Sequence, residues 1–182
     1  MTSQGNVPDH DKLDLISLIG SALADFEHSL LSTGWRGKEN DCVNLFTHGF
    51  LFSRIHADAA ITDFTQVGIE VGVPKPPSIG SKEACRKDLV IWRQPRQVAY
   101  DEKTWKPSKH PMAIVEWKTH RKPITPILDA RDIQWLSAYS QHLPDFVGFA
   151  VTVDFTSNNR RVASALIQRD NYLEDFHRKG LQ

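Results

Sequence analysis

From residue 38 onward, the chain alternates between helix-like and strand-like hydrophobic patterns, and the order of these patterns restricts the folds open to it. A helical pattern over residues 38–54 precedes three strand-length runs, and a second helical pattern over residues 129–142 precedes two more. Apolar residues recur every 3.6 positions in an amphipathic helix and every second position in a half-buried strand. The order predicts an α/β fold in which helices flank a mixed central sheet.

The strand-like runs are short and rich in β-branched residues, as strands are. They cover residues 66–74, 86–93, 112–119, 146–153 and 161–168. A small hairpin is expected around residues 96–106, and a short helix from Asn171 onward. Residues 11–31 carry apolar side chains at helical spacing, which predicts an amphipathic helix ahead of the core.

Length and cysteine content limit the class of protein. A chain of 182 residues with 40% apolar content can form one well-packed core, so we expect a single domain over residues 1–182. No apolar run approaches the roughly 18 residues that span a bilayer, and the N-terminus lacks a signal-peptide pattern. Cys42 and Cys85 occur without a Cys-x-x-Cys pattern, which predicts free thiols. A soluble, cytoplasmic protein without membrane contact is expected.

The net charge of zero conceals an uneven distribution of charge along the chain. Residues 1–70 contain 4 Lys and Arg against 10 Asp and Glu, whereas residues 86–122 contain 10 Lys and Arg against 4 Asp and Glu. A basic segment can bind phosphates, and it can equally be a solvated surface. Charge alone leaves both interpretations open.

The run over residues 112–119 contains a Glu-x-Lys triplet. Glu116 and Lys118 are two residues apart, so both side chains leave the same face of the strand while Trp117 points to the opposite face. By itself such a triplet is usually a surface ion pair. Asp88, however, opens the strand-like run most suited to pair with this one, so two carboxylates are expected to converge near one end of adjacent strands.

Lys87-Asp88 on one strand and Glu116-Trp117-Lys118 on the next, in an α-β-β-β-α-β order, resemble the PD-(D/E)XK nuclease superfamily, which has the restriction-endonuclease-like fold. The resemblance covers roughly residues 38–168, and Lys87 stands where the family name has proline. It implies a magnesium- or manganese-dependent nuclease with an αβββαβ core. Asp88, Glu116 and the backbone carbonyl of Trp117 would ligate the ion, and Lys118 would position and deprotonate the attacking water.

The resemblance also implies further site residues. Glu39, in the first turn of the helix before the sheet, corresponds to an additional acidic residue near the metal, although a glutamate there is also favoured by the helix dipole. Gln134 is similar to the glutamine of the RecB-like Gln-x-x-x-Tyr element, while Tyr139 departs from that spacing by one residue. The basic residues expected to bind substrate phosphates are Lys103, Lys106, Lys109, Arg121 and Lys122, and Trp105 is expected near nucleic acid.

Two rival hypotheses remain beside a nuclease acting on DNA. The chain could be an inactive member of the same fold that binds nucleic acid or protein, since fold does not fix function. It could also be an unrelated α/β domain in which Glu116 and Lys118 form a structural ion pair. Without a separate recognition domain, a partner protein or a second copy of the chain is expected to supply targeting.

Overall fold

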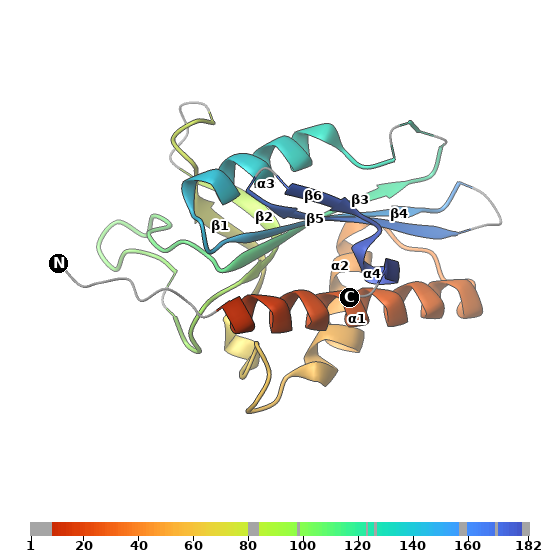
Figure 1. Ribbon diagram of the computed structural model, residues 1–182, viewed down its shortest axis with the longest axis horizontal. Helices are drawn as coiled ribbons and strands as arrows, with labels where there is room; N and C mark the ends of the chain where they lie inside the picture. Colours follow the sequence, from red (N-terminus) through yellow and green to blue (C-terminus); the bar gives the residue numbers. More distant parts are fainter. Residues whose placement is uncertain are drawn as a thin grey trace.

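Figure 1 shows a mixed sheet with helices on both of its faces. The computed structural model describes residues 9–79, 84–97, 99–122, 124–125, 127–156, 160–169 and 171–179. The six strands of the sheet follow one another in chain order: β1 (Val67–Pro74), β2 (Ala84–Ile91), β3 (Ala113–His120), β4 (Val147–Asp154), β5 (Arg161–Gln168) and β6 (Asn171–Glu174). The predicted α/β class, with a mixed sheet flanked by helices, is confirmed.

One strand pair in this sheet is parallel. β3 and β4 run in the same direction and are joined through helix α3 (Ala130–His142), while every other neighbouring pair is antiparallel. A parallel pair needs a crossover that returns the chain to its starting edge, and α3 provides it. The crossover places α3 over one face of the sheet, where it packs on β4 and β5, the strands that follow the one carrying the Glu-x-Lys triplet (Figure 1).

The opposite face is covered by helices α1 (Asp9–Thr33), α2 (Glu39–Phe46) and α4 (Phe176–Lys179) (Figure 1). The predicted N-terminal helix is therefore confirmed and extends slightly further. The helix predicted over residues 38–54 begins at Glu39 and continues to Arg54. Its hydrogen-bond pattern changes along the way, because a π-helical turn (Thr47–Leu51) and a 3₁₀ turn (Phe52–Arg54) follow α2. The hydroxyl of Thr47 donates to the carbonyl of Val43 within this change (2.7 Å).

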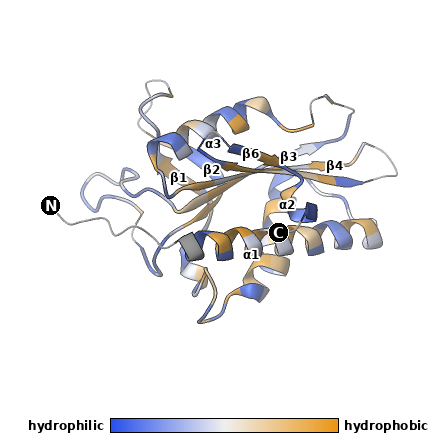
Figure 2. Ribbon diagram, in the orientation of Figure 1, coloured by the Kyte–Doolittle hydropathy of each residue, from blue (hydrophilic) through white to orange (hydrophobic). Residues whose placement is uncertain are grey.

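Two apolar cores lie on the two faces of the sheet. The strands are largely hydrophobic in Figure 2, as expected for a sheet packed on both sides. Between the sheet and α1, Trp117 contacts Phe26 edge-on, with ring centroids 5.5 Å apart, and lies beside Phe46. Between the sheet and α3, Leu136 and Tyr139 are fully buried.

Two sequence predictions differ from the structure. The hairpin expected around residues 96–106 is reduced to an isolated bridge between Tyr100 and Pro107, because the intervening residues form a tight turn. The tail predicted to begin as a helix at Asn171 begins instead as strand β6, which pairs with β5, and only then forms α4. Within the described residues, no helix is long and apolar enough to cross a membrane.

Candidate active site

The candidate site begins where strands β2 and β3 separate. Their pairing extends from Ile91 opposite Ala113 to Leu89 opposite Val115 and is not continued beyond that pair. At the next position, the carboxylate of Asp88 accepts a hydrogen bond from the backbone N–H of Trp117 (2.7 Å). Asp88 therefore closes the gap between the strands with its side chain, which fixes one of its oxygens beside the Glu-x-Lys triplet.

A local change of sheet face accompanies this separation. On β2, Cys85 packs with the core under α3, whereas Leu89, four residues later, packs with the core on the α1 side. In an undisturbed strand, residues four apart share a face. The switch lies opposite Glu70 of β1, which has a left-handed φ of +57°, a rare conformation for a residue other than glycine. The switch turns Lys87 toward α3.

Glu116 is nearly inaccessible to solvent and is paired with Lys87. The Lys87 ammonium group forms an ion pair with the Glu116 carboxylate and lies 3.4 Å from the centroid of the Trp135 ring, a cation–π contact. Burial raises the pKa of Glu116, and the nearby charges of Asp88 and Asp132 add to this effect, while Lys87 opposes it. Glu116 therefore takes up a proton more readily than an ordinary carboxylate.

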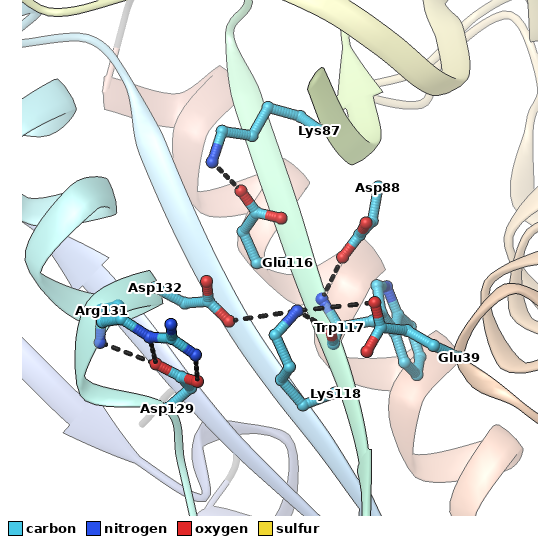
Figure 3. Close-up of polar contacts among 9 residues, drawn as sticks. All are labelled: Glu39, Lys87, Asp88, Glu116, Trp117, Lys118, Asp129, Arg131 and Asp132. Atoms are coloured by element: carbon cyan, nitrogen blue, oxygen red, sulfur yellow. Dashed lines mark hydrogen bonds and ion pairs between the residues drawn. The ribbon is translucent and has the colours of Figure 1, made fainter. Parts of the chain in front are cut away.

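Lys118 lies at the centre of three oxygen acceptors (Figure 3). Its Nζ atom is 2.7 Å from the carbonyl oxygen of Trp117, 3.5 Å from the Glu39 carboxylate and 3.6 Å from the Asp132 carboxylate. Burial alone would lower the pKa of Lys118, but the surrounding carboxylates, Asp132 and Glu39 first among them, raise it. Without a further cation, Lys118 is therefore an ammonium ion rather than a base.

Glu39 and Asp132 come from helices on opposite faces of the sheet. Glu39 is the first residue of α2, and the buried Gly37 just before this helix allows a close contact with Trp35 that a side chain would prevent. Burial raises the pKa of Glu39 and also that of Asp132, and Lys118 opposes the increase in both. Asp88 raises both values further, so its charge reaches both groups.

The cluster contains more acidic than basic groups. Among the described residues whose charges act on one another, four carboxyl groups (Glu39, Asp88, Glu116 and Asp132) face two ammonium groups (Lys87 and Lys118), and the adjoining Asp129–Arg131 ion pair adds one charge of each sign. Burial is the main cause of the raised pKa values of Glu39, Glu116 and Asp132; the lysines oppose it, and the neighbouring carboxylates offset part of that opposition. A divalent cation would restore neutrality at this position.

The donor atoms suit magnesium or manganese, since carboxylate and carbonyl oxygens are the ligands that hard cations prefer. Within the described part of the chain, no three Asp, Glu, His or Cys side chains are close enough to form a preformed metal site. Magnesium commonly binds through one or two carboxylates and keeps several waters, so Asp88 and Glu116 with the Trp117 carbonyl are a sufficient set. In this structure the Lys118 ammonium group donates a hydrogen bond to that carbonyl oxygen.

A shallow hollow of about 430 Å³ lies beyond the end of β3, directly past Lys118. Arg121 and Lys122, both predicted to bind substrate, line it and are exposed. Lys38, the residue before Glu39, adds a third basic side chain, and His120 lies in the same wall. The hollow therefore continues the candidate site with positive charge and contains no carboxylate in its lining.

The other residues predicted to bind substrate lie elsewhere. Gln134 is on the exposed side of α3, two residues beyond Asp132, and no contact described for it reaches the carboxylates. Lys103, Lys106 and Lys109 are exposed in the segment between β2 and β3, which is fastened to β1 through Tyr100.

Two charged residues of the cluster were not identified from the sequence. Asp132 shares the inward stripe of α3 with Leu136 and Tyr139, at helical spacing, so a carboxylate on an otherwise apolar stripe was the available signal. Lys87 had no such signal, because its direction depends on the change of sheet face. We found no family model, curated protein or solved structure that matches the chain.

Proposed function

We propose that this protein is a magnesium- or manganese-dependent nuclease of the PD-(D/E)XK type, with a restriction-endonuclease-like core over residues 38–168. The observation that carries the proposal is the half-buried cluster in which carboxyl groups outnumber ammonium groups four to two. An excess of two acidic groups at the meeting point of two strands matches the charge of a divalent cation. A cluster that served only stability would be expected to be neutral.

Each residue of the cluster has a role in this proposal. Asp88 and Glu116 would hold the ion together with the carbonyl oxygen of Trp117, and the hydrogen bond from Trp117 N–H orients Asp88. A bound divalent cation lowers the pKa of a coordinated water and neutralises charge on the scissile phosphate. A bound cation beside Lys118 would favour loss of its ammonium proton to solvent, and the neutral amine would then position the attacking water and accept its proton.

Glu39 and Asp132 hold Lys118 in place from the two sides of the sheet. Both carboxylates are within 4 Å of its Nζ atom, so the lysine side chain cannot rotate away without breaking two ion pairs. They act through Lys118 and are positioning residues for it. Lys87 balances the charge of Glu116 while the metal is absent.

DNA is the favoured substrate, and the basic hollow past Lys118 supports this assignment. Lys38, Arg121 and Lys122 would neutralise phosphates of the strand that leaves the cluster. The second candidate is an inactive member of the same fold that binds nucleic acid or protein. The full set of Asp88, Glu116 and Lys118, each in contact with another part of the cluster, favours catalysis over this alternative.

The proposal is tested by incubating the purified protein with plasmid, linear duplex and single-stranded DNA in magnesium or manganese. We expect cleavage by the parent protein that is lost in chelator and in the Asp88→Ala variant. The exposed Asp58, in the turn that precedes the 3₁₀ turn at Phe64, provides the matched control, because Asp58→Ala removes a carboxylate of the same chain outside the cluster. Absence of cleavage on all three substrates, with binding retained, would instead identify an inactive nucleic-acid-binding protein.

A further inference from the structure

The segment between β2 and β3 presents a tryptophan to solvent. The Trp105 side chain is 78% exposed, more than any other large hydrophobic side chain in the described residues. A single exposed apolar residue is common on protein surfaces, but an indole ring offers a large flat face that folding usually buries. The exposure of the Trp105 ring, and the backbone conformation that produces it, therefore need an explanation.

The turn that carries Trp105 is held by several hydrogen bonds. The N–H of Trp105 donates to the carbonyl of Asp101 (2.9 Å), and the N–H of Asp101 donates to the carbonyl of Lys106 (2.9 Å). The Asp101 carboxylate also accepts from the N–H of Lys103 and from both the N–H and the hydroxyl of Thr104. Within this turn Trp105 has a φ of +55°, a strained conformation for a bulky residue.

This turn is mounted on the strand beside Asp88. The hydroxyl of Tyr100 accepts a hydrogen bond from the N–H of Gly72 on β1 (3.2 Å), and Pro107 packs against the same glycine. A Cβ atom at Gly72 would lie 3.1 Å from Pro107, so a side chain there would push Pro107 away by a few tenths of an ångström. Gly72 pairs with Arg86, two residues before Asp88, and the turn is thereby fixed next to the strand of the cluster.

Exposed lysines accompany the indole ring. Lys103 and Lys106 lie within the turn and Lys109 follows it, and one oxygen of the Asp101 carboxylate accepts the hydrogen bonds that hold the turn. Lysines beside an outward-facing aromatic ring are the combination that binds unpaired nucleotides: the charges attract phosphates, and the ring stacks on a base. Bases inside a duplex are already stacked on each other and offer no free face to the ring.

We propose that Trp105 is a base-stacking platform for an unpaired nucleotide, so the substrate includes a single-stranded segment. This inference rests on the proposed nuclease function for the position of the substrate. The backbone of that segment passes the lysines of the turn, and its base lies on the indole ring beside the strand that carries Asp88.

The test compares binding of a labelled single-stranded DNA oligonucleotide with binding of the duplex of the same sequence, in calcium to suppress cleavage. Trp105→Ala is expected to weaken single-strand binding by about 5- to 100-fold, the loss of one base–aromatic stack. Trp105→Phe is expected to retain most of the affinity, and duplex binding should be unchanged in both variants. Phe64→Ala, which removes another exposed aromatic ring (63% exposed), is the matched control and should bind like the parent.

An unchanged single-strand affinity in Trp105→Ala would overturn the inference, and so would an equal loss for single strand and duplex. Since the ring is exposed, Trp105→Ala should unfold at the parent temperature, and this separates lost stacking from lost folding. The binding measurement does not require cleavage. A parent protein that binds single strands through Trp105 but cuts no DNA would contradict the nuclease proposal and leave the stacking platform intact.

Discussion

Two buried carboxylates in this protein, Glu27 and Glu116, have opposite electrostatic surroundings. Glu27 of α1 accepts hydrogen bonds from the N–H of Val162 (3.0 Å), from His177 (3.2 Å) and from the guanidinium group of Arg178. Burial alone would raise the pKa of Glu27, but these bonds, led by those from His177 and Arg178, lower it to about 2. The pKa of Glu116 is raised instead, although Lys87 is paired with it.

The difference between these surroundings indicates which of the two carboxylates stabilises the fold. Donors from α4 and β5 satisfy both oxygens of Glu27, and His177 is held on its other side by the buried hydroxyl of Ser164 (2.6 Å). This network fastens α4 to α1 and β5. The surroundings of Glu116 include further carboxyl groups and leave negative charge uncompensated, which costs stability and is expected where a ligand will supply the missing charge.

The largest expected effect is on cleavage. Glu116→Gln should lower the cleavage rate by at least about 10³-fold, because it removes a metal ligand while keeping the shape of the side chain, whereas Glu27→Gln should leave the rate per folded molecule unchanged. Rates of DNA cleavage in magnesium, normalised to folded protein, measure both. Lys118→Ala should be as inactive as Glu116→Gln while retaining metal binding. Equal losses in the Glu27 and Glu116 variants would remove the distinction between the two regions.

Stability should respond in the opposite way. Glu27→Gln breaks a buried ion pair and should lower the free energy of unfolding by about 3 kcal/mol, or the melting temperature by roughly 6 to 12 °C for a chain of this size. Thermal unfolding in chelator measures the change. Under the same conditions Glu116→Gln leaves Lys87 buried without its partner but relieves repulsion from Asp88 and Asp132, so it should lose less stability than Glu27→Gln. If Glu116→Gln were the more destabilised of the two, Glu116 would be primarily a structural residue.

The ion pair between Lys87 and Glu116 should couple the stability of this region to metal binding. Lys87→Met should destabilise the metal-free protein by about 2 to 4 kcal/mol, because it leaves Glu116 buried without its partner, and manganese should restore part of that loss. The double variant Lys87→Met/Glu116→Gln removes both members of the pair and should regain most of the stability. Denaturant unfolding of the three variants, with and without manganese, measures this coupling. A strictly additive double variant would show that the ion pair does not determine the stability of this region.

Sequence patterns predicted the parts of this site that depend on residues close together in the chain, and they missed the parts that depend on contacts between distant segments. The period of two along β3 was enough to place Glu116 and Lys118 on one face, and the neighbouring strand was enough to bring Asp88 to them. Lys87 faces α3 because β2 changes sheet face between Lys87 and Leu89, opposite the left-handed Glu70 of β1, and the hydrophobic pattern of β2 alone does not reveal that change.

The fold shows the same division between local and distant interactions. Apolar periodicity identified the two long helices and the first five strands, because burial imposes the period. Strand β6 was missed because all of its residues are exposed, so it carries no apolar alternation and is defined only by its pairing with β5. The π and 3₁₀ turns at the end of the predicted helix were likewise not predicted, because the apolar spacing there does not distinguish them from an α-helix.

A smaller effect concerns pH, which should move the two regions in opposite directions. The folded-state pKa of Glu27 is lowered from 4.5 to about 2, so its contribution is complete above the unfolded value and is lost as the pH falls from about 5 to 2. The pKa of Glu116 is raised, so the stability associated with it is present at low pH and is lost as the pH rises above the ordinary carboxyl value. The stability difference between parent and Glu27→Gln should therefore shrink on acidification. For Glu116→Gln, the stability of the variant relative to the parent should increase as the pH rises; matching pH profiles for the two variants would contradict both assignments.

The measurement that tests the central claim most directly is the melting temperature of the parent protein as manganese is titrated in the absence of DNA. A cation that neutralises the excess charge of the cluster binds only the folded state, so at about 100 times its dissociation constant it should add about 2.7 kcal/mol and raise the melting temperature by roughly 5 to 10 °C. Asp88→Ala and Glu116→Gln should lose this increase, and Glu27→Gln should keep it from a lower starting temperature. A parent melting temperature that does not change with manganese, or one that rises equally in Glu116→Gln, would contradict the account of this cluster as a metal-dependent active site.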